Sequence, residues 1–181
     1  MFRKLLTTGL FVIIICLFSQ SPLKAQYTVD NHYVGPSIGL SFLGSTFQIG
    51  GNYEYALNVE NFGKVGIGGI FRYWGYSDAF YYGGKWSYTN IFIGAQGNYH
   101  FEIKGSPRLD PYAGIVLAYN GGSVSYSGPA GIYATPSQGG IWLGFQGGIR
   151  YFINPNLALT GRVGFGTLSY GALEVGVDFK L

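Results

Sequence analysis

Histidine, serine and carboxylate side chains are the groups in this chain that could carry acid–base or nucleophilic chemistry. A hydrolase needs a nucleophile, a base and an orienting group within hydrogen-bond reach of one another. The chain has two histidines, His32 and His100, and neither has a serine beside it on the same face of its segment. Two histidines so far apart in the sequence also make a poor metal site. We therefore predict no catalytic, cofactor-binding or metal-binding residues.

A second set of residues with possible chemistry is charged or titratable. All of its members stand at the polar positions of segments in which apolar and polar residues alternate: Glu54, Arg72, His100, Arg150, Arg162, Glu174, Asp178 and Lys180. Alternation with a period of two puts successive side chains on opposite faces of a β-strand. The set therefore belongs to one face of a sheet, and its role depends on how the strands are arranged.

The first 25 residues predict a secretory signal peptide. Arg3 and Lys4 precede the apolar run Leu5–Phe18, and a polar stretch with a small-residue cleavage site ends at Ala25. A membrane anchor is the alternative, but the run is shorter than the roughly 20 residues that a spanning helix needs. We expect cleavage after Ala25 and one domain over residues 26–181. Cys16 leaves with the leader, which excludes thiol nucleophiles and thiolate metal sites.

The composition is unusual for a soluble domain. Charged residues make up 10% of the chain and aromatic residues 18%, whereas about 25% charged residues are typical. Once Arg3, Lys4 and Lys24 are removed with the leader, eight basic residues balance eight acidic ones, so no basic patch for nucleic acid remains. Disorder is excluded because aromatic and β-branched residues are abundant and periodic.

Alternation recurs in eight segments, each close to the 9–11 residues that a tilted transmembrane strand requires. The predicted strands are Tyr33–Phe42, Phe47–Leu57, Val65–Tyr73, Thr89–Phe101, Pro111–Tyr119, Ile141–Tyr151, Leu157–Phe165 and Leu173–Leu181. Pro36 interrupts the first of these, since proline lacks a ladder donor. We expect strand pairing to begin after it.

The composition of the polar face indicates whether that face points outward to water or inward to the lumen of a barrel. A lipocalin-like soluble barrel is the main competitor, and its outer surface would be rich in Lys and Glu. Here the polar face is mostly Gly, Ser, Asn and Gln, which suits a narrow lumen better than a water-covered surface. We therefore predict an all-β fold, an eight-stranded antiparallel up-and-down transmembrane β-barrel. Lipid then contacts the apolar face, and alternate strands end in an aromatic girdle that includes Tyr53, Tyr99 and Phe179.

The connections between the strands predict which end is external. The two longest, 76–87 and 121–140, fall on the same side, as external loops of membrane barrels do. Tyr76, Trp86 and Tyr126 are among several aromatic residues in these loops. Exposed aromatic residues suit either ligand capture or packing of an extended hairpin, and the sequence favours neither.

The charged set then lines the barrel interior. Buried charges must pair, and we expect Arg162 to contact Glu174 or Asp178 across the last hairpin. An ion path or gate is one interpretation of this cluster. A structural plug is the one that we favour, because the interiors of eight-stranded barrels are filled by side chains.

Several features together resemble the small outer-membrane β-barrel family related to OmpA and OmpX. They are the leader, the eight amphipathic strands, the strand opening Pro111-Tyr112-Ala113-Gly114, the hairpin over 151–159 and the alternating terminal strand. The resemblance implies a monomer in the outer membrane of a Gram-negative cell, in contact with lipid and lipopolysaccharide. It also implies insertion by the outer-membrane assembly machinery, which commonly reads an aromatic final residue. This chain ends in Leu181, with Phe179 two places earlier.

The expected function is a structural or surface-interaction role without catalysis, with a possible external ligand at 76–87 and 121–140. A narrow pore for small solutes is the alternative. A lipid-modifying enzyme ranks third, because such enzymes exist among eight-stranded outer-membrane barrels.

Overall fold

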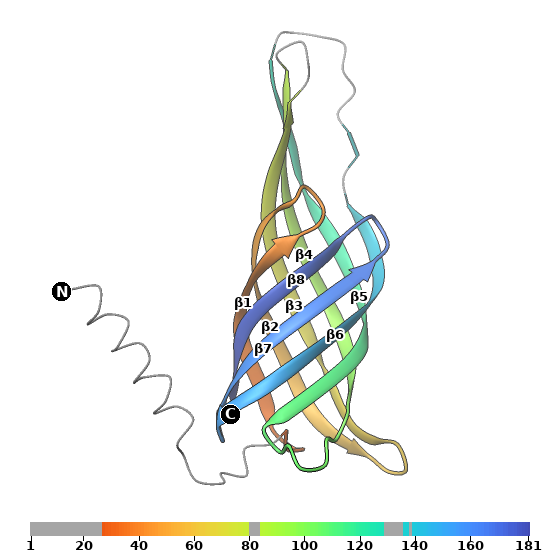
Figure 1. Cartoon of the computed structure of the whole chain (residues 1–181). Helices are drawn as coiled ribbons and strands as arrows, with labels where there is room; N and C mark the ends of the chain where they lie inside the picture. The colour runs from red at the N-terminus through yellow and green to blue at the C-terminus, as the bar shows by residue number, and fades with distance from the viewer. Residues whose placement is uncertain (1–26, 80–83, 129–135, 138) are drawn as a thin grey trace, which may run out of the picture.

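The fold is a closed barrel of eight antiparallel strands, seen in a computed structural model that describes residues 27–79, 84–128, 136–137 and 139–181. Each strand pairs with the next along the chain, and β1 pairs with β8 to close the sheet. The strands are β1 (His32–Ser41), β2 (Thr46–Val59), β3 (Gly63–Ala79), β4 (Lys85–His100), β5 (Leu109–Ser127), β6 (Gly140–Asn154), β7 (Leu157–Gly166) and β8 (Gly171–Lys180). They run obliquely around the barrel (Figure 1). The predicted fold class is confirmed.

Among the residues that the structure describes, no helix is long and apolar enough to span a membrane. The signal peptide predicted for residues 1–25 lies outside the described residues, and so does the cleavage site.

The apolar rows face outward, as the alternation predicts. Phe47, Ile115 and Phe145 are exposed, whereas their strand neighbours Gln48, Val116 and Gln146 are buried inside the barrel. In water an exposed band of this size would aggregate, but in hydrocarbon it is the favourable surface. The barrel therefore presents its apolar rows to lipid and its other rows to the lumen.

Pro36 does not delay strand pairing, so the prediction that pairing begins after it is wrong. β1 starts at His32, and Pro36 lies opposite Gly51 of β2. Toward β8, the ladder pairs Val34 with Phe179 and resumes at Ser37 with Gly176. The missing N–H of proline thus interrupts only the β8 side, and the intact β2 side keeps the strand in place.

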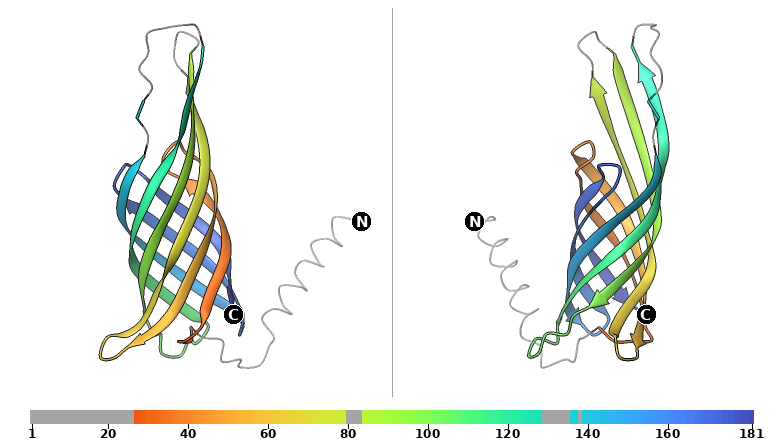
Figure 2. Two further views of the ribbon diagram at one scale, coloured as in Figure 1. Left: turned by 180° about the vertical axis from the view of Figure 1, so that it is seen from behind. Right: turned by 90° about the vertical axis from the view of Figure 1, so that its right-hand side faces the viewer.

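β3 and β5 are much longer than predicted, and β4 begins four residues earlier than predicted. β3, β4 and β5 continue past the rest of the barrel as a three-stranded sheet, which we call the extension (Figures 1 and 2). The prediction that 76–87 and 121–140 are loops is wrong for residues 76–79, 85–87, 121–127 and 140, which are strand. Residues 80–83, 129–135 and 138 lie outside the described residues.

Ladder pairing and ring stacking explain why the extension is ordered as strand. Pairing continues to Ala79 with Lys85 and to Lys85 with Ser127. On the face that continues the lumen side, the rings of Tyr76 and Tyr88 stack with their centroids 4.6 Å apart, and those of Trp86 and Tyr126 lie 4.9 Å apart. The aromatic residues of the predicted loops therefore hold a hairpin together.

The orientation of the rows can be tested on one strand. Ile115 and Ser125 both point outward from β5, the first within the apolar band and the second on the extension. Ile115→Arg should lower the free energy of unfolding of the vesicle-inserted barrel by about 2–4 kcal/mol, because it places a cation in hydrocarbon. Urea titration of vesicle-bound protein measures this. Ser125→Arg is the matched control, and an equal loss there would contradict the proposed membrane boundary.

Candidate functional site

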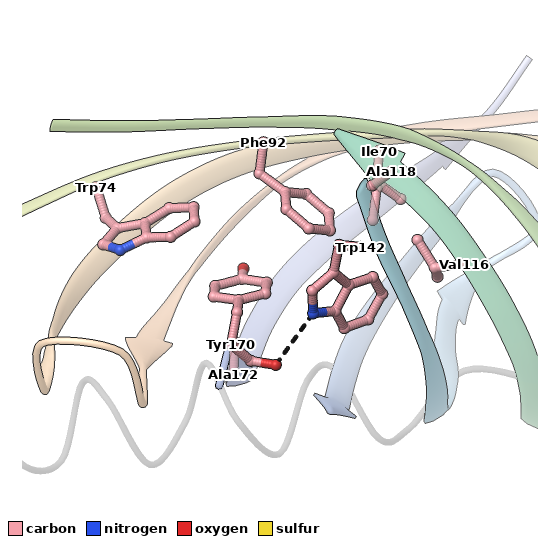
Figure 3. Close-up of a cluster of buried hydrophobic side chains, with 8 residues drawn as sticks. All are labelled: Ile70, Trp74, Phe92, Val116, Ala118, Trp142, Tyr170 and Ala172. Carbon is pink, nitrogen blue, oxygen red and sulfur yellow. Dashed lines mark hydrogen bonds between the residues drawn. The ribbon is translucent and has the colours of Figure 1, made fainter. Parts of the chain in front are cut away.

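The lumen is the place where most of the chemistry-bearing residues meet, and the half nearer the extension is largely aromatic. Trp74, Phe92, Trp142 and Tyr170 turn their rings toward one another there, with Ile70, Val116, Ala118 and Ala172 packed around them (Figure 3). The ring of Tyr170 stacks on Trp74 with centroids 4.6 Å apart, and its backbone carbonyl accepts a hydrogen bond of 3.3 Å from Trp142 Nε1. The expectation of polar side chains throughout the lumen is therefore wrong for this half.

Below the aromatic layer lies a first ionic cluster, centred on Glu174 of β8. Arg162 of β7 is directly opposite it in the strand register, and Arg162 Nε donates to Glu174 Oε2 over 2.7 Å. Arg72 of β3 reaches the same carboxylate, with 2.8 Å between Nη2 and Oε2. Gln48 donates to Glu174 Oε1 over 2.7 Å and accepts from the Tyr170 hydroxyl. One carboxylate thus joins side chains from β2, β3 and β7.

Glycines make room for these long side chains. A Cβ at Gly39, which lies opposite Glu174, would be 2.8 Å from Glu174 Cγ. A Cβ at Gly50, opposite Arg72, would be 2.5 Å from Arg72 Cδ. Contacts that short do not occur without movement of the neighbour, so the cluster requires glycine at both positions.

A second ionic cluster fills the end of the lumen where the described chain begins and ends, and it is centred on Arg150 of β6. Arg150 Nε donates to Asp178 over 2.6 Å, and its Nη1 donates to Glu54 over 2.8 Å. His100 lies between two carboxylates, with Nδ1 2.8 Å from Asp110 and Nε2 3.2 Å from Glu54. All five side chains are buried.

Tyr27 closes this second cluster from below. Its ring stacks on His100 with centroids 3.7 Å apart, and its hydroxyl donates to Glu54 over 3.2 Å. Burial raises the pKa of Tyr27, and the Glu54 carboxylate raises it further, so the phenol stays protonated and can donate. The rings of Tyr27, Tyr33 and Tyr112 each lie within 5.5 Å of the Arg150 guanidinium, which adds cation–π attraction.

The structure brings seven of the eight predicted interior residues into these two clusters. Arg72, Arg162 and Glu174 form the first, and Glu54, His100, Arg150 and Asp178 belong to the second. Lys180 stands apart. It is half-buried at the lower rim, where its Nζ lies 3.5 Å from Thr28 Oγ1, and no described carboxylate is within ion-pair distance of it.

Sequence reasoning missed two members of the second cluster. Asp110 stands one residue before the predicted start of its strand, and continuing the alternation back from Tyr112 would have placed it inward. Tyr27 precedes the first strand and has no periodic signal. Its role is apparent only from the structure, in which it contacts Glu54 and His100 at the end of the lumen.

The two histidines lie on opposite sides of the barrel wall. His32 is outside, where its Nδ1 is 2.8 Å from the Tyr53 hydroxyl, and His100 is held inside by carboxylates. In the described part of the chain, no group of three or more His, Cys, Asp or Glu residues is arranged to hold a metal ion. The contacts that the structure shows in the two clusters are ion pairs between side chains of different strands.

The first cluster makes a direct prediction about stability. Glu174→Gln keeps the shape of the side chain but leaves Arg72 and Arg162 facing a neutral amide. Breaking a buried ion pair in this way costs about 3–5 kcal/mol, so the urea midpoint of unfolding in detergent should fall strongly. Glu102→Gln is the control, because Glu102 pairs with Lys64 over 2.6 Å on the exposed surface and should change little. Equal midpoints for both variants would show that the cluster does not stabilise the fold.

Two of three comparisons with known proteins found matches, and both point to the same class of barrel. The family model described as Opacity family porin protein matches residues 25–176. No curated protein matches the chain significantly. The fold is similar to that of the N-terminal barrel domain of Pseudomonas aeruginosa OprF, with a TM-score of 0.54, 12% identity, and 84% of this chain and 98% of that chain covered.

Two further solved structures share the fold. The outer-membrane protein OprG of Pseudomonas aeruginosa matches with a TM-score of 0.53 and 10% identity over 88% of this chain and 99% of its own. Ail of Yersinia pestis, in complex with the heparin analogue sucrose octasulfate, matches with a TM-score of 0.52 and 13% identity over 83% and 97%. The expected likeness to small outer-membrane barrels is confirmed. Because the family model covers most of the sequence, the chain belongs to the Opacity family of porin proteins.

Proposed function

We propose that this protein is a non-conducting structural barrel of the outer membrane that also presents an external surface with few charged residues for interaction. The observation that carries the proposal is the filling of the lumen by two ionic clusters and an aromatic layer, whose side chains are buried and engaged with one another. A plug of this kind joins most of the strands and stabilises a narrow barrel.

The small size of the internal spaces supports a closed lumen. The cavity between the aromatic layer and Glu174 has a volume of about 30 Å³, and the one beside Tyr27 and His100 has a volume of about 20 Å³. Each is comparable to the space that one water molecule occupies. A narrow pore, the alternative function, needs a continuous water path, and side chains would have to move to open one.

The placement of the histidines supports a role without catalysis. A hydrolase needs a base that can reach a nucleophile. Both ring nitrogens of His100 face carboxylates, and His32 faces a phenol on the outer wall. In the described part of the chain, neither histidine therefore faces a nucleophile that it could activate for a lipid-modifying reaction.

The extension supports an interaction surface of a particular chemistry. Its outward face carries hydroxyl residues in register: Ser77, Ser87 and Ser125 in one row, and Thr89 and Ser123 in the row below. The sequences 76–87 and 121–140 contain only Asp78 and Lys85 as charged residues. A neutral, hydroxyl-bearing partner such as an oligosaccharide fits this surface better than a sulfated one of the kind bound by Ail.

The export and assembly of the protein complete the proposal. Removal of residues 1–25 releases the domain 26–181, the outer-membrane assembly machinery inserts it, and the monomer lies among lipid and lipopolysaccharide. Tyr27 supports cleavage nearby, because its position in the lower mouth fixes the start of the barrel close to residue 26.

Planar-bilayer recording tests the closed lumen. Purified, folded protein should show no steady conductance, because the packed side chains leave no continuous water path along which an ion could cross the lumen. Detergent without protein is the blank. Steady, ion-selective openings that scale with the amount of protein would favour the pore instead.

A shortened hairpin tests the external surface. Gly75 and Thr89 are paired, so residues 76–88 can be replaced by Asn-Gly, which forms a tight turn between antiparallel strands. On a panel of neutral and sulfated oligosaccharides, the full-length protein should bind neutral ones, and the shortened protein should lose this binding while keeping its heat-modifiable gel mobility. Binding that is confined to sulfated sugars, that survives the shortening, or that is absent from the full-length protein would contradict the proposal.

A further inference from the structure

The outer wall of the barrel has an apolar hollow that the structural role does not explain. Its volume is about 680 Å³, and it spans β1 to β4. Outward-facing Pro36, Gly51 and Gly69 form the floor. The large outward side chains around it are Val34, Tyr53, Phe71, Ile93 and Phe179.

The barrel itself does not require the glycines of this floor. A Cβ at Gly51 would meet only a backbone oxygen at 3.8 Å, and one at Gly69 only a backbone oxygen at 3.4 Å, which are ordinary contacts. Their inward neighbours differ, since a Cβ at Gly50 or Gly68 would lie 2.5 Å or less from other atoms. Glycine within a strand weakens it, so an outward glycine with free space above it calls for another explanation.

The surroundings of the hollow indicate what fills it. It opens on the lipid-facing surface, among exposed apolar side chains, and its lining contains no charged residue. Its occupant is therefore hydrocarbon, and the hollow is continuous with the membrane interface that the apolar rows already form.

One end of the hollow has a polar mouth. Tyr53 belongs to the wall, and its hydroxyl is 2.8 Å from Nδ1 of the exposed His32. His32 begins β1, at the end of the barrel where the described chain starts and finishes (Figure 1). Tyrosine at such a level marks the boundary between hydrocarbon and headgroups. A lipid whose headgroup lies at His32 and Tyr53 can lay a chain upward over the glycine floor.

We propose that this hollow is a binding site for one acyl chain of a phospholipid from the periplasmic leaflet, with the lipid headgroup at the His32–Tyr53 pair. The floor of small residues lets the chain approach the backbone closely, so that dispersion contacts form on several sides of it. Such a lipid exchanges more slowly than the lipids that surround the rest of the barrel.

Filling the hollow tests the proposal. In Gly51→Leu/Gly69→Leu, two side chains occupy the space of the acyl chain. The matched control is Gly97→Leu/Gly161→Leu, at outward glycines that lie outside the hollow, where an added Cβ would have no other atom within 4 Å. Each protein is folded into nanodiscs of phosphatidylethanolamine and phosphatidylglycerol and then released for native mass spectrometry, with heat-modifiable mobility as the check of folding.

The expected result is one retained phospholipid on the wild-type protein and on the control, and at least tenfold less retention on the filled variant. Equal retention by the filled and control variants would overturn the proposal. So would a wild-type dimer that only the filled variant loses, because the hollow would then receive a second copy of the chain. In nanodiscs that also contain lipid A, preferential retention of lipid A would overturn the assignment to the periplasmic leaflet.

Discussion

The absence of hydrogen-bond partners in hydrocarbon is the constraint on which the rest of this structure depends. A strand in lipid must find partners for its backbone on both sides, since each unpaired amide costs several kcal/mol. This requirement explains why β1 pairs with β8 to close the sheet. It also explains why Pro36 is tolerated, since its strand remains fully paired with β2. The same constraint turns the apolar rows outward and leaves all other side chains to share a narrow interior.

That interior determines how the charges are arranged. A guanidinium or carboxylate enclosed by eight strands is stable only with a partner, and each cluster is built around one side chain that contacts several strands. Glu174 is the centre of the first and Arg150 of the second. Three arginines face four carboxylates in the two clusters, so a protonated His100 brings their sum to neutrality. Glycines opposite the longest side chains provide the space, so the ion pairs depend on glycine at these positions.

The sequence was sufficient to predict the number of strands, the faces of the strands and seven charged or titratable residues of the two clusters, because a period of two is a local property. It was not sufficient for properties that depend on neighbours across the sheet. Phe92 stands between Ile91 and Ile93, and this apolar run hides the alternation that points it into the lumen. Tyr27 has no strand of its own. The strand character of Tyr76 and Trp86 depends on ring contacts with Tyr88 and Tyr126 on the neighbouring strands.

The extension shows how one alternating pattern serves two surroundings. Up to the row that pairs Tyr73 with Ile91, the outward side chains of β3 and β4 are apolar. In the next row, Gly75 lies opposite Thr89 and Thr89 opposite Ser123, and hydroxyl side chains continue above it. Aromatic residues recur on the inward side of β3 and β4 over the same distance: Trp74, Tyr76, Tyr88 and Trp86. A change confined to the outward side, at one height on three strands, reflects the surrounding medium and not the packing of the sheet. We therefore infer that the boundary of the hydrocarbon at the extension end of the barrel lies between these two rows.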